Sequence, residues 1–135
     1  MTLEIVNPPD WPVPRGYVNG VVATGRTLFV AGQIGWNERC EFETDDFVEQ
    51  FAKALDNVLA VVRAAGGEPT HVVRMTIFVT DLDAYRSSLR AIGQAWKPRF
   101  GKHFPAMALV GVAGLVEPRA KVEIEATACL PEAAP

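Results

Sequence analysis

The alternation of apolar and polar residues divides the chain into short strands and two amphipathic helices. Within residues 44–65, apolar side chains recur at steps of three and four, which predicts a helix with one apolar face. Asp46 followed three residues later by Glu49 is typical of a capping box, and Thr44 is an equally usable cap. The same spacing over residues 82–98 predicts a second helix, which ends near a proline.

Runs of β-branched residues predict the strands. Residues 19–24 and 27–33 form two such runs around Gly25-Arg26, which indicates a hairpin. Residues 71–80 are so apolar that they predict a central strand buried on both faces. Two more strands are expected at residues 106–113 and 121–128, and the latter alternates apolar with charged residues.

The resulting order, β-β-α-β-α-β-β, predicts an α+β fold with a mixed sheet and both helices on one face. The length of 135 residues suits one domain spanning residues 1–135. Residues 1–15 carry four prolines around Trp11 and are expected to form an extended arm. Residues 130–135 are expected to be a flexible tail.

Composition excludes several classes of protein. The net charge of −3 and the lack of a basic stripe argue against nucleic acid as a partner. Apolar runs are too short for a membrane span, and the start of the chain has no secretory pattern, so we expect a cytoplasmic protein. The two cysteines, Cys40 and Cys129, lie far apart without nearby ligand-type residues, which argues against a metal site.

Several segments are shared, in order and spacing, with one known family. They are Gly16-Tyr17, Phe29-Val-Ala-Gly-Gln-Ile34, Asn57, Thr76-Ile-Phe-Val-Thr-Asp-Leu82 and Val122-Glu-Ile-Glu-Ala126. Together they resemble the RidA/YjgF (reactive intermediate deaminase) family over nearly the whole chain. The resemblance implies a chorismate mutase-like RidA fold, a homotrimer, and a ligand site in each cleft between neighbouring subunits.

The resemblance also implies hydrolysis of an imine or enamine without metal or cofactor. Tyr17 stands where the family places a phenol that lines the cleft, and Glu123 where it places the carboxylate that orients water. Gly32 and Ile34 stand where backbone groups approach the ligand. The family's carboxylate-binding arginine is replaced here, because the motif reads Pro105-Ala106-Met107-Ala108.

Other residues are candidates for the cleft. Arg15 and Arg119 are possible replacements for the missing cation, and His103 is a possible acid-base group, although each also reads as an ordinary surface or loop residue. Trp36 is expected either at the cleft rim, where it stacks on a flat ligand, or packed against the Trp11 arm.

Without the resemblance, the same residues have simpler explanations. Glu123 reads as a solvated residue on a polar strand face, Tyr17 as a packing aromatic, and Met107 as core filler or pocket wall. The expected function is a cofactor-free hydrolase or deaminase of a small metabolite, with a non-catalytic metabolite-binding trimer as the alternative. A third hypothesis, ribonuclease activity, is disfavoured by the acidic net charge.

Overall fold

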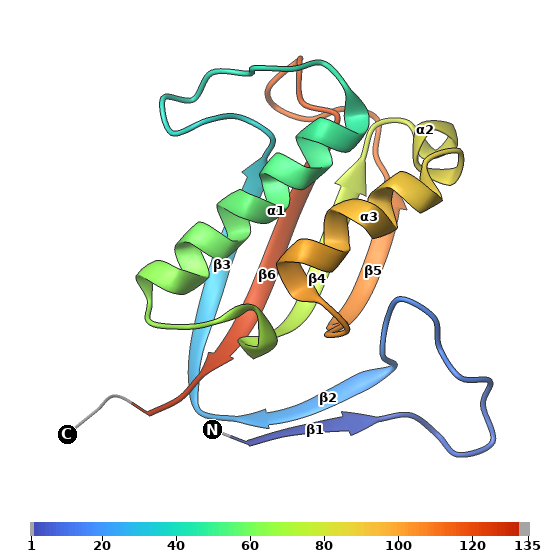
Figure 1. Ribbon diagram of the computed structural model, residues 1–135, viewed down its shortest axis with the longest axis vertical. Helices are drawn as coiled ribbons and strands as arrows, with labels where there is room; N and C mark the ends of the chain where they lie inside the picture. The colour runs from blue at the N-terminus through green and yellow to red at the C-terminus, as the bar shows by residue number, and fades with distance from the viewer. Residues whose placement is uncertain (1, 133–135) are drawn as a thin grey trace.

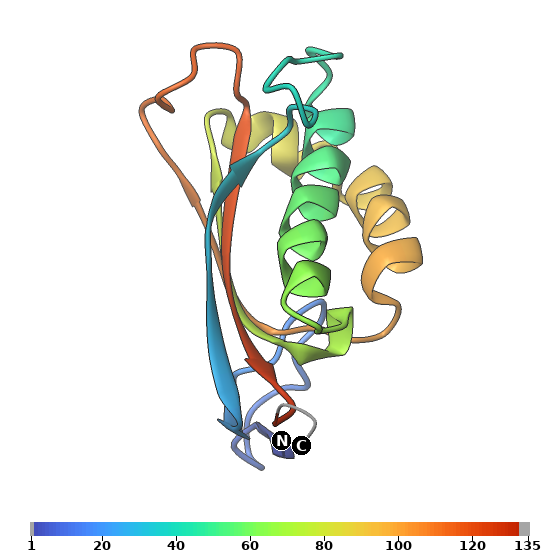
Figure 2. The same cartoon turned by 90° about the vertical axis from the view of Figure 1, so that its left-hand side faces the viewer.

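The computed structural model describes residues 2–132, which form a curved sheet covered on one side by helices (Figures 1 and 2). The elements follow the order β1 (Thr2–Val6), β2 (Gly20–Thr24), β3 (Arg26–Ile34), α1 (Phe47–Ala64), the 3-10 turn η1 (Pro69–His71), β4 (Val72–Val79), α2 (Leu82–Arg86), α3 (Leu89–Phe100), β5 (Ala106–Gly111) and β6 (Val122–Leu130).

The main sheet has four strands in the order β3-β6-β4-β5. β6 runs antiparallel to both of its neighbours, whereas β4 and β5 are parallel, so the sheet is mixed. Figure 2 shows α1 and α3 on the same side of this sheet and a bare opposite side. The predicted α+β class, with two helices on one face of a mixed sheet, is therefore confirmed.

The core lies between the sheet and the helices because the strands alternate. In β6, Val122, Ile124 and Ala126 are buried in the same apolar cluster as the inward face of α1, whereas Glu125 on the alternate positions is exposed. β4 is an interior strand as predicted, but buried residues alternate along most of it with residues that are half-buried or, at Arg74, exposed. The prediction that it is buried on both faces is wrong, because no layer within residues 2–132 covers the second face.

α1 begins as the sequence predicts. The side chain of Asp46 accepts a hydrogen bond from the backbone N–H of Glu49 at 2.9 Å. The Glu49 carboxylate does not return to the Asp46 backbone, as in a capping box, but accepts a hydrogen bond from the Thr44 hydroxyl. Both candidate caps thus contribute to the same helix start, which fixes the orientation of α1 against the sheet.

The second predicted helix is interrupted. α2 is capped by Asp81, whose side chain accepts from the backbone N–H of Ala84 at 3.1 Å, and it ends before α3 begins. α3 also continues past Pro98, where the sequence predicts its end. The buried ring of Phe100 stacks on Trp96 with centroids 4.3 Å apart, and this packing favours the last turn despite the proline.

The predicted hairpin is wrong, and this error has the largest structural consequence. β2 pairs with β1, which the sequence analysis assigned to an extended arm, and makes no ladder with β3. A single residue, Gly25 with a φ of 142°, connects β2 to β3. The β1–β2 ribbon therefore crosses the lower end of the main sheet, as Figure 1 shows, and β3 is left as an edge strand.

The C-terminal boundary also differs from the prediction. Leu130 is the last residue of β6 and is only 2% exposed, so it belongs to the core and not to a tail. The remainder of the predicted tail includes residues 133–135, which lie outside the described residues. Within residues 2–132, no helix has the length and apolar character needed to cross a membrane.

Candidate functional site

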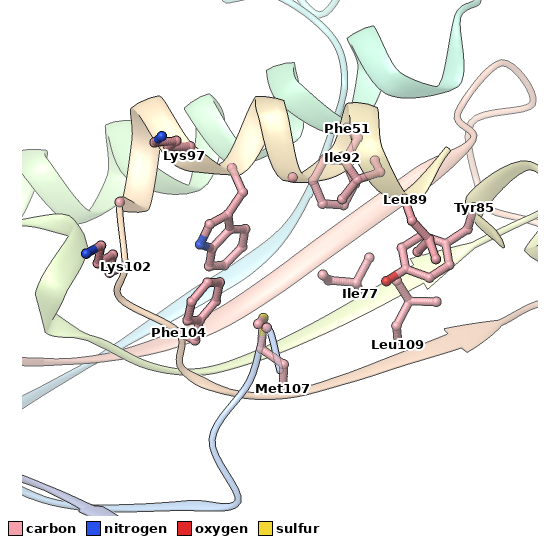
Figure 3. A pocket seen from close by; sticks show the side chains of 14 residues that line it. Phe51, Ile77, Tyr85, Leu89, Ile92, Lys97, Lys102, Phe104, Met107 and Leu109 are labelled. Atoms are coloured by element: carbon pink, nitrogen blue, oxygen red, sulfur yellow. The ribbon is translucent and has the colours of Figure 1, made fainter. Parts of the chain in front are cut away.

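An apolar cavity of about 420 Å³ lies between α3 and β5. It forms there because Met107 and Leu109 on β5 and Ile92 and Trp96 on α3 direct their side chains into the space between sheet and helix. Figure 3 shows Met107 rising from β5 toward this space. The position at which the resemblance implies an arginine is thus part of the wall of a largely apolar cavity.

The cavity has polar groups only toward its two ends. Tyr85 lies with its hydroxyl at one end, beside Leu89 and Leu109, and Lys97 and Lys102 lie at the other (Figure 3). The remaining lining is aliphatic, aromatic or glycine. Such a lining favours a ligand with an apolar body and few polar groups.

Stacked aromatic rings make the wall of the cavity rigid. The Trp96 ring stacks on Phe100 and on Phe104, with centroid distances of 4.3 and 5.7 Å. The Trp96 indole N–H donates to the backbone oxygen of His103 at 3.2 Å. Because its polar atom has a partner in the chain, Trp96 presents an apolar face to the cavity.

Tyr17 lines a second cavity, which shares Met107 with the first. A small cavity of about 160 Å³ is lined by Tyr17, Asn19, Arg74 and Met107, among others. The segment is held at β5 by a parallel bridge between Val18 and Ala106. Tyr17 is 43% exposed. One copy of the chain therefore brings together two of the predicted site residues, Tyr17 and Met107.

Glu123, Gly32 and Ile34 form a second group. Glu123 on β6 lies opposite Ile34 on β3, where a bulge between Val30 and Gln33 shifts the register. The half-buried Glu123 side chain crosses Gly32, because a Cβ built on Gly32 would be 2.5 Å from its Oε1. A glycine is required here for this carboxylate to lie where it does.

The two groups do not meet within one chain. β5 and β6 are separated by β4, and Met107 lies opposite Met75 whereas Glu123 lies opposite Phe78. Met107 and Glu123 are separated by two strand spacings across the sheet and by three residues along the strand direction. Their backbones therefore lie about 14 Å apart. Their side chains also point to opposite faces of the sheet. A single copy therefore separates the Glu123 carboxylate from the apolar cavity at Met107.

The remaining candidates have structural partners. Arg119 forms an ion pair with Asp45 at 3.0 Å and lies 5.3 Å from the ring centre of Phe42. The His103 Nε2 lies 2.7 Å from the Val72 backbone oxygen, so His103 joins the start of β4 to the loop before β5. Neither residue lines the cavities at Met107.

Trp36 and Arg15 are also placed away from Met107. The Trp36 ring lies against Phe42, with centroids 5.8 Å apart. Asn57 fixes this loop, because its side-chain amide donates to the backbone oxygens of Ile34 at 2.9 Å and Trp36 at 2.8 Å. Arg15 is exposed and lines neither cavity at Met107.

Sequence reasoning missed two polar residues that line the cavities, Tyr85 in the larger one and Arg74 in the smaller one. Tyr85 lies within residues 82–98, which the sequence predicts only as an amphipathic helix, and its phenol enters the larger cavity. Arg74 was treated as one residue of a buried strand, yet it is exposed beside Tyr17. The alternation along β4 is the signal that could have identified Arg74, because it places every second residue on the open face.

Comparison with known proteins identifies the family of the chain. The sequence pattern of the family described as endoribonuclease L-PSP matches residues 11–130. The chain is 36% identical, over 90% of its length and 92% of the relative, to a 2-iminobutanoate/2-iminopropanoate deaminase of Dermatophagoides farinae. It is 37% identical to the protein of the same name from Escherichia coli K12, over 83% of this chain and 85% of the relative.

Solved structures show the same fold. A Rid-family protein of unknown function from Yersinia pestis is 34% identical and superposes with a TM-score of 0.85, covering 96% of this chain and all of the other. The YjgF gene product of Escherichia coli is 36% identical with a TM-score of 0.66, covering 84% of this chain and 87% of the other.

Proposed function

The chain belongs to the endoribonuclease L-PSP family of RidA/YjgF proteins, and we propose that it is a cofactor-free deaminase acting on a small imine or enamine. The names of the relatives, deaminases of 2-iminobutanoate and 2-iminopropanoate, support this reaction class. The observation that carries the proposal is the half-buried Glu123 carboxylate lying across Gly32, where it can act as a base for water.

The proposed reaction needs only water. The water oxygen adds to the carbon of the C=N bond while Glu123 takes one water proton, and Glu123 then passes this proton to the substrate nitrogen to give a carbinolamine. In the second step Glu123 takes the hydroxyl proton of the carbinolamine and passes it to the amino group, so that the C–N bond breaks, the carbonyl forms, ammonia leaves and the Glu123 carboxylate is restored. An enamine first takes a proton on carbon to become the imine. Tyr17 contributes a phenol O–H that contacts the substrate next to Met107.

This proposal requires more than one copy of the chain. Glu123 and Met107 are too far apart in one copy to act on the same small molecule, so the site forms where the Glu123 side of one copy meets the Met107 side of another. A homotrimer with three such clefts is the arrangement that the family resemblance implies.

The substrate we propose differs from a simple 2-imino acid. Met107 has no charge and no donor with which to hold a carboxylate. Loss of a bidentate charge-assisted contact in a cleft costs on the order of 2 to 5 kcal/mol, or about 30 to several thousandfold in rate. The apolar lining around Met107 supports a substrate whose apolar body, and not a carboxylate, supplies the binding energy.

Ammonia release from a matched substrate panel tests the proposal. Each apolar imine or enamine is compared with its carboxylate-bearing counterpart, using the full chain, Glu123→Gln and Met107→Arg. We expect Glu123→Gln to lower kcat about 100- to 10,000-fold on the active substrates. We expect Met107→Arg to shift kcat/KM toward carboxylate-bearing substrates by roughly 10- to 1,000-fold, and Met107→Leu, as the control, to leave this preference unchanged.

Two results contradict the proposal. One is the absence of ammonia release from every substrate, and the other is equal rates for the unaltered chain and Glu123→Gln.

Non-catalytic binding of a small metabolite is the second candidate function. It is favoured by the same observation that makes Met107 unusual, an apolar cavity without a charged anchor at its centre. A compound that raises the Tm and is recovered unchanged after long incubation supports binding over catalysis. Conversion of that compound with release of ammonia supports the deaminase.

A further inference from the structure

The β1–β2 ribbon and the free edge of β3 together indicate how two copies of the chain join. β3 pairs with β6 on one side only, so its other edge presents unpaired backbone groups. β2 pairs with β1 on one side only, so it also has a free edge. An isolated two-stranded ribbon is marginally stable in water, so both free edges favour a further strand.

The two edges fit each other in sequence. A hairpin around Gly25-Arg26 would place Thr24 opposite Thr27 and, by counting outward, Val22 opposite Phe29. Both of these apolar side chains are exposed in the single chain, Val22 by 55% and Phe29 by 79%. An aromatic ring opposite a β-branched residue is a favourable cross-strand pair. β2 is therefore complementary to the edge of β3 in the register that the sequence predicts.

The chain cannot close this pairing on itself in the structure observed. The tightest common hairpin loop has two residues, which would be Gly25 and Arg26. Arg26 is already part of β3, because it pairs with Leu130 of β6 and its Nε donates to the Pro131 oxygen at 3.0 Å. Only Gly25 remains as a connection, and its φ of 142° directs β2 away from β3. Short hinges of this kind favour exchange between copies.

We propose that β2 of one copy adds as a strand to the free β3 edge of a neighbouring copy. The occupant of the β3 edge is thus a second copy of this chain. The exchange extends each main sheet and covers Val22 and Phe29 with each other.

The exchange also brings the two halves of the candidate site together, a consequence that rests on the proposed function. Tyr17 is held near Met107 of its own copy through the bridge between Val18 and Ala106. Antiparallel pairing of β2 with the neighbour's β3 places the segment before β2 beside the neighbour's Gly32, across which the neighbour's Glu123 lies. The carboxylate that one copy keeps away from its own cavity then approaches the cavity of the next.

Disulfide trapping tests the exchange. Opposed residues of an antiparallel pair have Cα atoms about 4.5 to 5.5 Å apart, within the range that a disulfide spans. Two full-length chains, Val22→Cys and Phe29→Cys, each also carrying Cys40→Ser to remove the exposed native thiol, are co-expressed and oxidised mildly. We expect a covalent dimer on a non-reducing gel, and no dimer when either chain is expressed alone.

A double variant separates exchange from an in-chain hairpin. With both cysteines in one chain, exchange gives covalently linked oligomers, whereas a closed hairpin gives an internally linked monomer. The matched control combines Val22→Cys with Val116→Cys, which is 97% exposed in the loop between β5 and β6, and should not form oligomers. Insertion of Asn-Gly after Gly25 supplies a full hairpin loop and should convert the linked oligomers of the double variant into linked monomers.

An internally linked monomer from the double variant, or no dimer from the co-expressed chains, overturns the exchange. Neither readout depends on catalysis, so a failure to release ammonia leaves this result intact. Conversely, an active enzyme with a closed hairpin retains the proposed function and refutes only the exchange.

Discussion

Substitution of Gly32 by alanine should inactivate the proposed deaminase while leaving the fold intact. The new Cβ would lie 2.5 Å from Oε1, 2.8 Å from Cδ and 3.0 Å from Cγ of Glu123. An ordinary contact distance is about 3.5 Å, so the carboxylate must move by about 1 Å. A displacement of this size at a reacting group costs on the order of 100-fold in rate. The side chain that moves ends in a flexible carboxylate, so the loss of folding free energy should stay below about 1 kcal/mol.

The assay is ammonia release together with urea unfolding. We expect kcat to fall about 100-fold and the urea midpoint to change little. Gly114→Ala is the control, because a Cβ there meets nothing within 4 Å, and it should leave kcat unchanged. Full activity in Gly32→Ala would refute the idea that catalysis depends on where the Glu123 carboxylate lies. An unfolded protein would refute the argument that the carboxylate can move with little loss of folding free energy.

Three other substitutions test the framework around the site. Asn57→Ala removes an amide that donates to two backbone oxygens at the end of β3, and urea titration should show a free energy of unfolding lower by about 2 kcal/mol. A decrease below about 0.5 kcal/mol, on the order of one weak hydrogen bond, contradicts this. Gly93→Ala, on α3 with nothing within 4 Å of a built Cβ, should raise that free energy by about 1 kcal/mol, and a lower urea midpoint speaks against the reasoning. Asp56→Ala removes two hydrogen bonds, of 2.7 and 3.2 Å, that the Asp56 carboxylate on α1 accepts from Arg99 on α3. The substitution should lower Tm by a few degrees, and by less at high salt. A decrease in Tm that does not depend on salt argues against an electrostatic cause.

Local patterns determine much of this fold, and those parts were predictable. The spacing of apolar residues in α1 requires one buried face, and Asp46 satisfies the first free N–H groups, so both the helix and its start follow from the sequence. The alternation in β6 likewise predicts which side chains face the helices. Each of these features depends on neighbours within a few residues along the chain.

The partner of β2 was not predictable in the same way. The runs around Gly25 satisfy every local rule for a hairpin, yet β2 pairs with β1. By composition, β1 and β3 are about equally suitable partners for β2. The choice between them depends on the conformation of Gly25 and on the pairing of Arg26 with β6, which keeps Arg26 in β3. This choice involves residues about 100 positions apart, which a local pattern does not contain.

The candidate site likewise has parts that local patterns predict and parts that depend on strand order. The sequence predicts Met107 and Glu123 individually as candidates, but their separation depends on the strand order β3-β6-β4-β5, which places the two candidates toward opposite edges of a single sheet. Under the proposed function, this division couples the reaction to association of copies, because neither edge alone holds both the Glu123 carboxylate and the apolar cavity. The proposed function also gives Met107 a role, because a site whose reacting groups come from a neighbouring copy needs only apolar contacts from the cavity wall to bind the apolar body of the proposed substrate.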